Sequence, residues 1–246
     1  MWNADKIVYR NDDSFVRAYQ GSELVWEKSI SNNKIYYTSS DGQIVTPDIG
    51  TGEESKGFGA NIVSNTYSGG RGVIVFDGDV TKIGYTAFGR CNTLQTIVIP
   101  DSVTSIGSYA FSYCERLTSI TIPDSVISIG KNAFFSCERL TSITIPNGIT
   151  SIDIGVFERC TSLISITIPF SVRDIEYNAF KDCNQLSEVI VNAVIPPNLY
   201  PEQYTGIYNQ FENNAPGRKI KVPAESLQVY KTADGWSEYS SSIISQ

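Results

Sequence analysis

Apolar residues recur every 23 residues along positions 71–192, in the same order each time. In a full repeat a leucine is followed three and five residues later by a pair of isoleucines or valines, as in Leu117, Ile120 and Ile122. One residue separates the members of the pair, so both face the same way, which predicts a short β-strand with one buried face. The proline that follows most of these pairs, such as Pro123, has no N–H to donate and ends the strand.

The remainder of each repeat leads through a valine or isoleucine, a second isoleucine and a phenylalanine to a cysteine. The stretch before the cysteine is too short for a full helix, and it predicts a turn or a short 3₁₀ or α segment on the outer side. One repeat cannot bury its apolar face alone, whereas stacked copies bury the columns as one core. The pattern therefore predicts a curved solenoid with a parallel sheet on its inner side.

The cysteines mark the register of this repeat, because all five lie 23 residues apart: Cys91, Cys114, Cys137, Cys160 and Cys183. Side chains at equivalent positions of a parallel ladder point the same way, which is poor geometry for a disulfide. A one-dimensional row of thiols is not a tetrahedral cage, and the chain has no histidine, so no metal site is predicted. We expect buried free thiols.

Counting by the same period extends the solenoid in both directions. Counting back from Ile97 and Ile99 reaches Ile74 and Phe76, which predicts a first strand before the regular repeats. Counting forward across an eight-residue insertion predicts a last strand over residues 220–222. In that last unit Asn214 takes the cysteine position and Gly217 the leucine position. The inserted loop is rich in tyrosine and proline and is expected to bulge from the coil.

The two ends of the chain do not follow the 23-residue pattern of the repeats. Residues 1–29 contain three alternating segments, 6–10, 14–19 and 23–28, which predict a small β meander. Residues 30–70 are interpreted as an N-terminal cap with a hairpin that turns at Asp41-Gly42. The repeats proper span residues 71–192. Residues 193–246 are interpreted as the degenerate last repeat and a C-terminal cap, whose apolar face is formed by Leu227, Tyr230, Trp236, Tyr239 and Ile243.

The consensus CxxLxxIxIPxxVxxIGxxAFxx resembles the BspA-like branch of bacterial leucine-rich repeat proteins. The segment 221–243 also resembles the terminal cap of many such proteins. The resemblance implies an α/β solenoid, a right-handed coil with a concave parallel β-sheet and short 3₁₀ or helical convex segments. It also implies a cell-surface or secreted adhesin that binds host matrix proteins such as fibronectin or fibrinogen.

Charge and composition exclude several classes of partner. The chain has 26 acidic and 19 basic residues, so binding to nucleic acid through phosphate neutralisation is not expected. The sequence contains no long apolar segment, so membrane insertion is not expected. The first residues lack the basic and apolar regions of a secretory signal, so a signal has been removed or export uses another route.

Candidate catalytic chemistry is nearly absent from the sequence. Without histidine, Ser-His and Cys-His mechanisms are excluded. The two SxxK matches, at Ser31 and Ser128, lack the companion motifs of penicillin-binding enzymes. The glycines at 50, 52, 57 and 59 form no phosphate-binding or dinucleotide fingerprint. We therefore predict a protein that is not an enzyme and has no cofactor.

The candidate ligand site is the concave face, where the strand residues that point away from the core form two columns. The first column is Thr96, Ser119, Ser142, Ser165, Glu188 and Lys219, and the second is Val98, Thr121, Thr144, Thr167, Ile190 and Lys221. The middle of this face is a row of hydroxyls, and Glu188 lies beside Lys219 at its C-terminal end. An extracellular protein or glycan is the expected ligand, although serine and threonine also simply suit solvent-facing strands.

A second hypothesis comes from the N-terminal meander. Its end, GSELVWEK, resembles short segments of some virion or tail-associated proteins. The alternative function is therefore a structural or receptor-binding component of a phage-like or other assembled particle, with self-association through the meander.

Overall fold

The computed structural model describes residues 31–49 and 57–246 in full, and between residues 6 and 27 it describes the backbone of short strands. These are β1 (Lys6–Ile7), β2 (Arg10–Asn11), β3 (Ser14–Phe15), β4 (Arg17–Gln20) and β5 (Glu23–Glu27). An antiparallel sheet has the order β1-β4-β5, and β2 pairs with β3. Strands thus occur in all three predicted segments of the meander, and its self-association stays a prediction.

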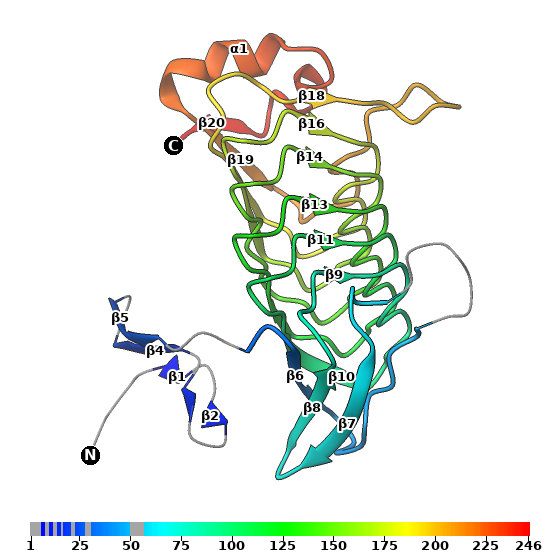
Figure 1. The fold of residues 1–246 in the computed structure, drawn as a ribbon. Helices are drawn as coiled ribbons and strands as arrows, with labels where there is room; N and C mark the ends of the chain where they lie inside the picture. Colours follow the sequence, from blue (N-terminus) through cyan, green and yellow to red (C-terminus); the bar gives the residue numbers. More distant parts are fainter. Residues whose placement is uncertain are drawn as a thin grey trace.

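The rest of the chain winds into a solenoid whose turns stack along one axis (Figure 1). The inner strands are β10 (Leu94–Val98), β12 (Ser119–Thr121), β15 (Ser165–Ile168), β17 (Glu188–Val191) and β19 (Lys219–Val222). Parallel pairing follows the predicted 23-residue register, with Thr96 opposite Ser119 and Ser165 opposite Glu188. The last strand forms where the count across the insertion places it, since Val189 lies opposite Ile220.

A second ladder of two-residue strands runs along another side of the coil and was not predicted. Its members are β9 (Lys82–Ile83), β11 (Ser105–Ile106), β13 (Ser128–Ile129), β14 (Ser151–Ile152), β16 (Asp174–Ile175) and β18 (Asn198–Leu199). The isoleucine of each pair, or Leu199 in β18, is buried, so this ladder lines a second side of the core.

The outer segments between this ladder and each cysteine are turns rather than helices. Each turn passes through left-handed backbone at one or two positions, which a regular right-handed helix cannot contain. The first of these positions is occupied by Thr86, Tyr109, Asn132, Gly155 and Asn178, and the second by Arg90, Tyr113, Ser136, Arg159, Asp182 and Asn213.

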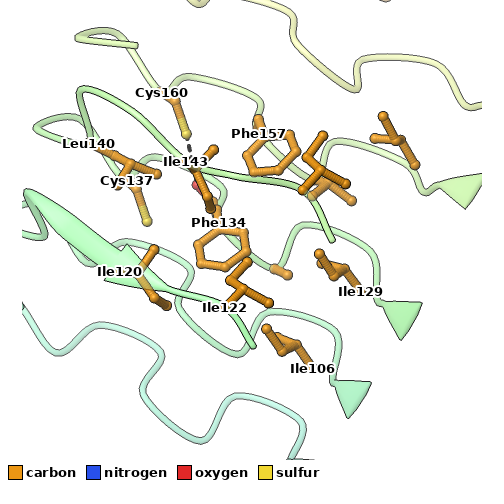
Figure 2. Packing of buried hydrophobic residues seen from close by; sticks show 14 of the residues in the cluster. Ile106, Ile120, Ile122, Ile129, Phe134, Cys137, Leu140, Ile143, Phe157 and Cys160 are labelled. Atoms are coloured by element: carbon orange, nitrogen blue, oxygen red, sulfur yellow. Dashed lines mark hydrogen bonds between the residues drawn. The ribbon is translucent and has the colours of Figure 1, made fainter. Parts of the chain in front are cut away.

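The core is a set of columns in which like residues stack on like (Figure 2). Phe111 and Phe134 are parallel with ring centroids 5.3 Å apart, and the same stacking continues from Phe88 to Phe211. All five cysteines are free, as predicted; four are buried and Cys91 is half-buried. The Cys160 thiol donates a hydrogen bond to the Phe134 carbonyl of the previous turn, at 3.2 Å.

The N-terminal cap differs from the prediction. The strands there are β6 (Lys34–Ser39), β7 (Ile62–Ser68) and β8 (Arg71–Phe76), in a sheet of order β12-β10-β6-β8-β7. The predicted hairpin at Asp41-Gly42 is wrong, because β6 pairs antiparallel with both β8 and β10. The strand that contains Ile74 therefore does not neighbour Ile97, although its apolar side chains are buried as the count requires.

The C-terminal cap covers the other end of the core. It consists of η1 (Ala224–Ser226), α1 (Leu227–Thr232), η2 (Trp236–Tyr239) and β20 (Ile243–Ser245), and β20 adds a parallel strand beside β19. Trp236 is fully buried against Phe211 and donates from Nε1 to the Pro197 carbonyl at 2.7 Å. No described helix combines the length and the apolar character needed to cross a membrane.

Both ladders are interrupted at the same level of the coil. Residues 141–146 form no strand, and the second ladder divides between β13 and β14. On the outer side the bonds between these turns remain, as from Phe134 N–H to the Val156 carbonyl at 2.9 Å. The core is slightly open here, because Ile122 and Ile143 are 7% and 8% exposed while Ile168 is fully buried. We call this level the seam.

Candidate functional site

The middle of the concave face is as predicted from the alternation of the strands. Isoleucine side chains enter the core and hydroxyl side chains between them face solvent, so β15 alternates exposed and buried. The six hydroxyl residues of the two columns are exposed: Ser119, Thr121, Ser142, Thr144, Ser165 and Thr167. We call these six residues the hydroxyl surface. Ser142 and Thr144 lie at the seam and keep the same outward direction as their neighbours.

The N-terminal end of the predicted site is closed. Val98 is only 3% exposed, because β6 continues the sheet and places Tyr36 opposite it. The Oγ1 atoms of Thr96 and Thr38 are 2.8 Å apart and share a hydrogen bond. The placement of Val98 in the ligand site is therefore wrong, and the accessible surface begins at Ser119. The sequence count could not show this because it locates equivalent positions but not an inserted neighbour.

The C-terminal end of the face carries the charges. Glu188 lies opposite Lys219, as the register predicts, but its ion pair is with Lys221, the diagonal neighbour. Lys219 is exposed, and among the described residues it takes part in no ion pair. Ile190 lies opposite Lys221 and is half-buried. A partly exposed pair of this kind contributes about 0.2–1 kcal/mol to stability.

The sheet extends one strand beyond the predicted site. β20 places Ile244 opposite Lys221, on the same face and half-buried. The only sequence signal for this strand was the Ile243-Ile244 pair near the end of the chain, which we interpreted as part of a cap. The concave face therefore ends in an apolar side chain beyond the lysines.

The chemistry of this face is hydrogen bonding without strong charge. Hydroxyl groups donate and accept, and neighbouring parallel strands repeat them at about 4.8 Å. No described group of three or more histidine, cysteine, aspartate or glutamate side chains is placed to hold a metal ion. Burial raises the pKa of the Cys91 thiol to about 11 and that of Cys160 to about 12, so neither is an activated nucleophile.

Sequence reasoning treated the outer turns as structural and singled out none of their side chains. In the structure Tyr85, Tyr109 and Tyr113 gather on the outer side of the first regular turns. A signal was available at two of these positions, because Tyr109 stands where later repeats carry Asn132, Gly155 and Asn178, and Tyr113 stands where they carry Ser136, Arg159 and Asp182.

The stacked turns, the 23-residue register and the concave parallel strands together define a leucine-rich repeat solenoid. The sequence pattern of the BspA type leucine rich repeat region matches in six copies across residues 73–197. The chain belongs to this family, whose fold serves protein interaction.

Solved structures of three bacterial proteins are similar to parts of this chain. A leucine-rich repeat protein of T. pallidum is 31% identical, with a TM-score of 0.50; the match covers 66% of this chain and 77% of that one. The pneumococcal vaccine antigen PcpA is 17% identical, with a TM-score of 0.49, and the shares are 68% and 38%. For a leucine-rich cell surface protein of Faecalibacterium prausnitzii the identity is 23%, the TM-score 0.32 and the shares 78% and 71%. No protein with a curated description matches the sequence.

Proposed function

We propose that this chain is a non-catalytic adhesion module that binds an extended segment of an extracellular protein along its concave face. The observation that carries the proposal is the hydroxyl surface, six exposed serine and threonine side chains on consecutive turns. A polypeptide offers N–H and C=O groups at regular intervals, and hydroxyls can pair with both kinds of group. Family membership supports the role, because BspA-type repeats are an interaction fold.

A protein ligand suits this face better than a glycan. Sugar-binding sites usually present aromatic rings for stacking, and the hydroxyl surface contains none. The charged end with Lys219 provides a place where an acidic residue of the ligand can dock. By resemblance to the BspA-like proteins, the ligand is a matrix protein such as fibronectin or fibrinogen and the chain acts at the cell surface.

Paired arginine substitutions on two faces test this proposal. Thr121→Arg with Thr144→Arg fills the hydroxyl surface with long charged side chains. Thr104→Arg with Thr150→Arg adds the same charge at exposed threonines outside the two columns; Thr150 is on the turn of Thr144, and Thr104 is on the turn before that of Thr121. Surface plasmon resonance on immobilised fibronectin and fibrinogen should show a loss of affinity of at least about tenfold, or about 1.4 kcal/mol, for the first pair only. Equal losses in both pairs, or none in the first, would refute a concave site.

A further inference from the structure

A second surface lies on the outer side of the first regular turns, away from the concave sheet. It is a depression of about 420 Å³. Its aromatic lining comes from Tyr85, Tyr109 and Tyr113, and Asp48, Arg90 and Ser112 supply polar groups. The lining comes from the cap segment before residue 50 and from two successive outer turns, so the solenoid itself assembles it.

The tyrosine rings of this depression lie at an angle to one another and are accessible to solvent. Tyr85 and Tyr109 meet edge to face, with centroids 5.9 Å apart and an interplanar angle of 78°. Tyr109 and Tyr113 are each 39% exposed. The Arg90 guanidinium lies 5.7 Å from the centre of the Tyr113 ring, and among the described residues it has no carboxylate partner. The depression therefore combines accessible tyrosine rings with the N–H donors of the Arg90 guanidinium.

Two of these tyrosines occupy backbone positions that do not favour them. Tyr109 and Tyr113 have φ angles of 58° and 59°, in the left-handed region. At the equivalent positions the next turn uses Asn132 and Ser136, and asparagine tolerates this conformation better than tyrosine. The other turns carry Gly155, Asn178 and Asp182, but also Thr86, Arg90 and Arg159. The turn itself thus does not require tyrosine.

A polar group in the lining is also unsatisfied. Ser112 is 4% exposed, and its hydroxyl has no hydrogen-bond partner in the structure. A buried hydroxyl without a partner is unfavourable unless a ligand or water completes it. This observation is independent of the tyrosines and points to the same depression.

We propose that this depression binds a short saccharide. The apolar faces of a sugar ring pack on tyrosine rings, while its hydroxyls match the side chains of Arg90, Ser112 and Asp48. One arginine beside one aspartate gives no cluster of positive charge, which disfavours a phosphorylated ligand. The site is separate from the hydroxyl surface and gives the chain a second binding function.

Substitutions that copy other turns of the same chain provide the test. Tyr109→Asn and Tyr113→Ser reproduce Asn132 and Ser136, so the outer turns keep residues suited to their backbone. Arg90→Ala has a matched control in Arg159→Ala, because Arg159 occupies the same position three turns later. Thermal unfolding of each variant checks that the fold is intact.

Saturation-transfer-difference NMR of the full chain then measures binding of N-acetyllactosamine, mannobiose, chitobiose and digalacturonic acid. We expect saturation transfer to ring protons of at least one of these sugars. The Tyr109→Asn/Tyr113→Ser and Arg90→Ala variants should bind it at least about tenfold more weakly. Arg159→Ala and the Thr121→Arg/Thr144→Arg pair should bind it as the wild type does.

Three results would overturn the proposal: no transfer to any of the four sugars at millimolar concentration, binding that survives the double tyrosine substitution, or equal weakening by Arg159→Ala. Because the concave pair is included, a failure here is distinguishable from a failure of the protein-binding site.

Discussion

The cysteine position in each repeat requires a small side chain with a hydrogen-bond donor. Cys114, Cys137, Cys160 and Cys183 each donate to the carbonyl of a phenylalanine 26 residues earlier, at 3.0–3.2 Å. In the last unit Asn214 donates from Nδ2 to the Phe180 carbonyl at 2.8 Å. Asparagine thus replaces cysteine because it can satisfy the same buried acceptor.

Removal of one of these donors should destabilise the fold. Cys137→Ala removes the thiol donor of the Phe111 carbonyl, which keeps its bond from the Cys114 N–H, and we expect a loss of about 0.5–1.5 kcal/mol in the free energy of unfolding. Cys91→Ala is the matched control, because the half-buried Cys91 thiol lies 3.8 Å from the Thr46 carbonyl and should cost less than about 0.5 kcal/mol. Urea unfolding measures both. A Cys137→Ala variant as stable as the wild type would contradict the role of the thiol.

The buried thiols also make stability depend on pH. Burial raises the pKa of Cys160 to about 12, from an ordinary value of 9.0. The folded state therefore holds this proton more tightly, so the stabilisation is complete below pH 9 and is lost as the pH rises from 9 toward 12. In this window each buried thiol lowers the free energy of unfolding by about 1.4 kcal/mol per pH unit. Urea midpoints between about pH 8 and pH 10 should fall steeply; equal midpoints would contradict this linkage.

At the scale of single elements, the seam has a local cause. Ser102, Ser125 and Ser171 each donate from Oγ to a carbonyl of the previous turn, at 2.7 Å in all three. Gly148 occupies the same position in the turn at the seam and has no hydroxyl to donate. A glycine there also loses more conformational freedom on folding. The missing bond falls where both ladders are interrupted.

A serine hydroxyl at position 148 should stabilise the contact between the turns at the seam. Gly148→Ser places an Oγ near the Val126 carbonyl, and the neighbour that must yield is the exposed side chain of Ile127. We expect a gain of about 0.5–1.5 kcal/mol and slower hydrogen exchange in residues 141–153. Ser125→Gly is the reverse control and should produce the opposite changes between its own pair of turns. Faster exchange in Gly148→Ser would show that the seam has another cause.

The elements also show how far the sequence could be interpreted. The period located every buried column, the last strand at Ile220 and the outward hydroxyls, because each depends only on position within the repeat. It could not locate β6, since an antiparallel strand from another segment obeys no period, and so Val98 was wrongly placed in the ligand site. It also could not show that Glu188 would pair with Lys221, because side-chain torsions decide between the direct and the diagonal neighbour.

For the whole molecule, the two caps decide whether the stack of repeats has exposed ends. Phe58 packs against Phe88 at one end, with centroids 5.7 Å apart, and Trp236 packs against Phe211 at the other, at 6.0 Å. A solenoid is stabilised mainly by contacts between neighbouring turns, so loss of a cap first exposes the adjacent turn.

Trp236→Ala should therefore open the C-terminal end. We expect a loss of about 3–5 kcal/mol, with hydrogen exchange rising first in β19 and β20 and later in β10. Val229→Ala, at an exposed position of the cap helix, should change stability by less than about 0.5 kcal/mol. Uniform exchange throughout the coil after Trp236→Ala would contradict the nearest-neighbour account.

The most direct test of the concave binding site uses the inertness of the native thiols. A new cysteine at Thr144, in a chain with Cys91→Ala, can carry an environment-sensitive dye on the hydroxyl surface, and a cysteine at Thr150 carries the same dye outside the two columns. On addition of fibronectin or fibrinogen, the fluorescence of the dye at position 144 should change and that at position 150 should not. A change at position 150 alone, or at neither position with both proteins, would contradict the proposed adhesion through the concave face.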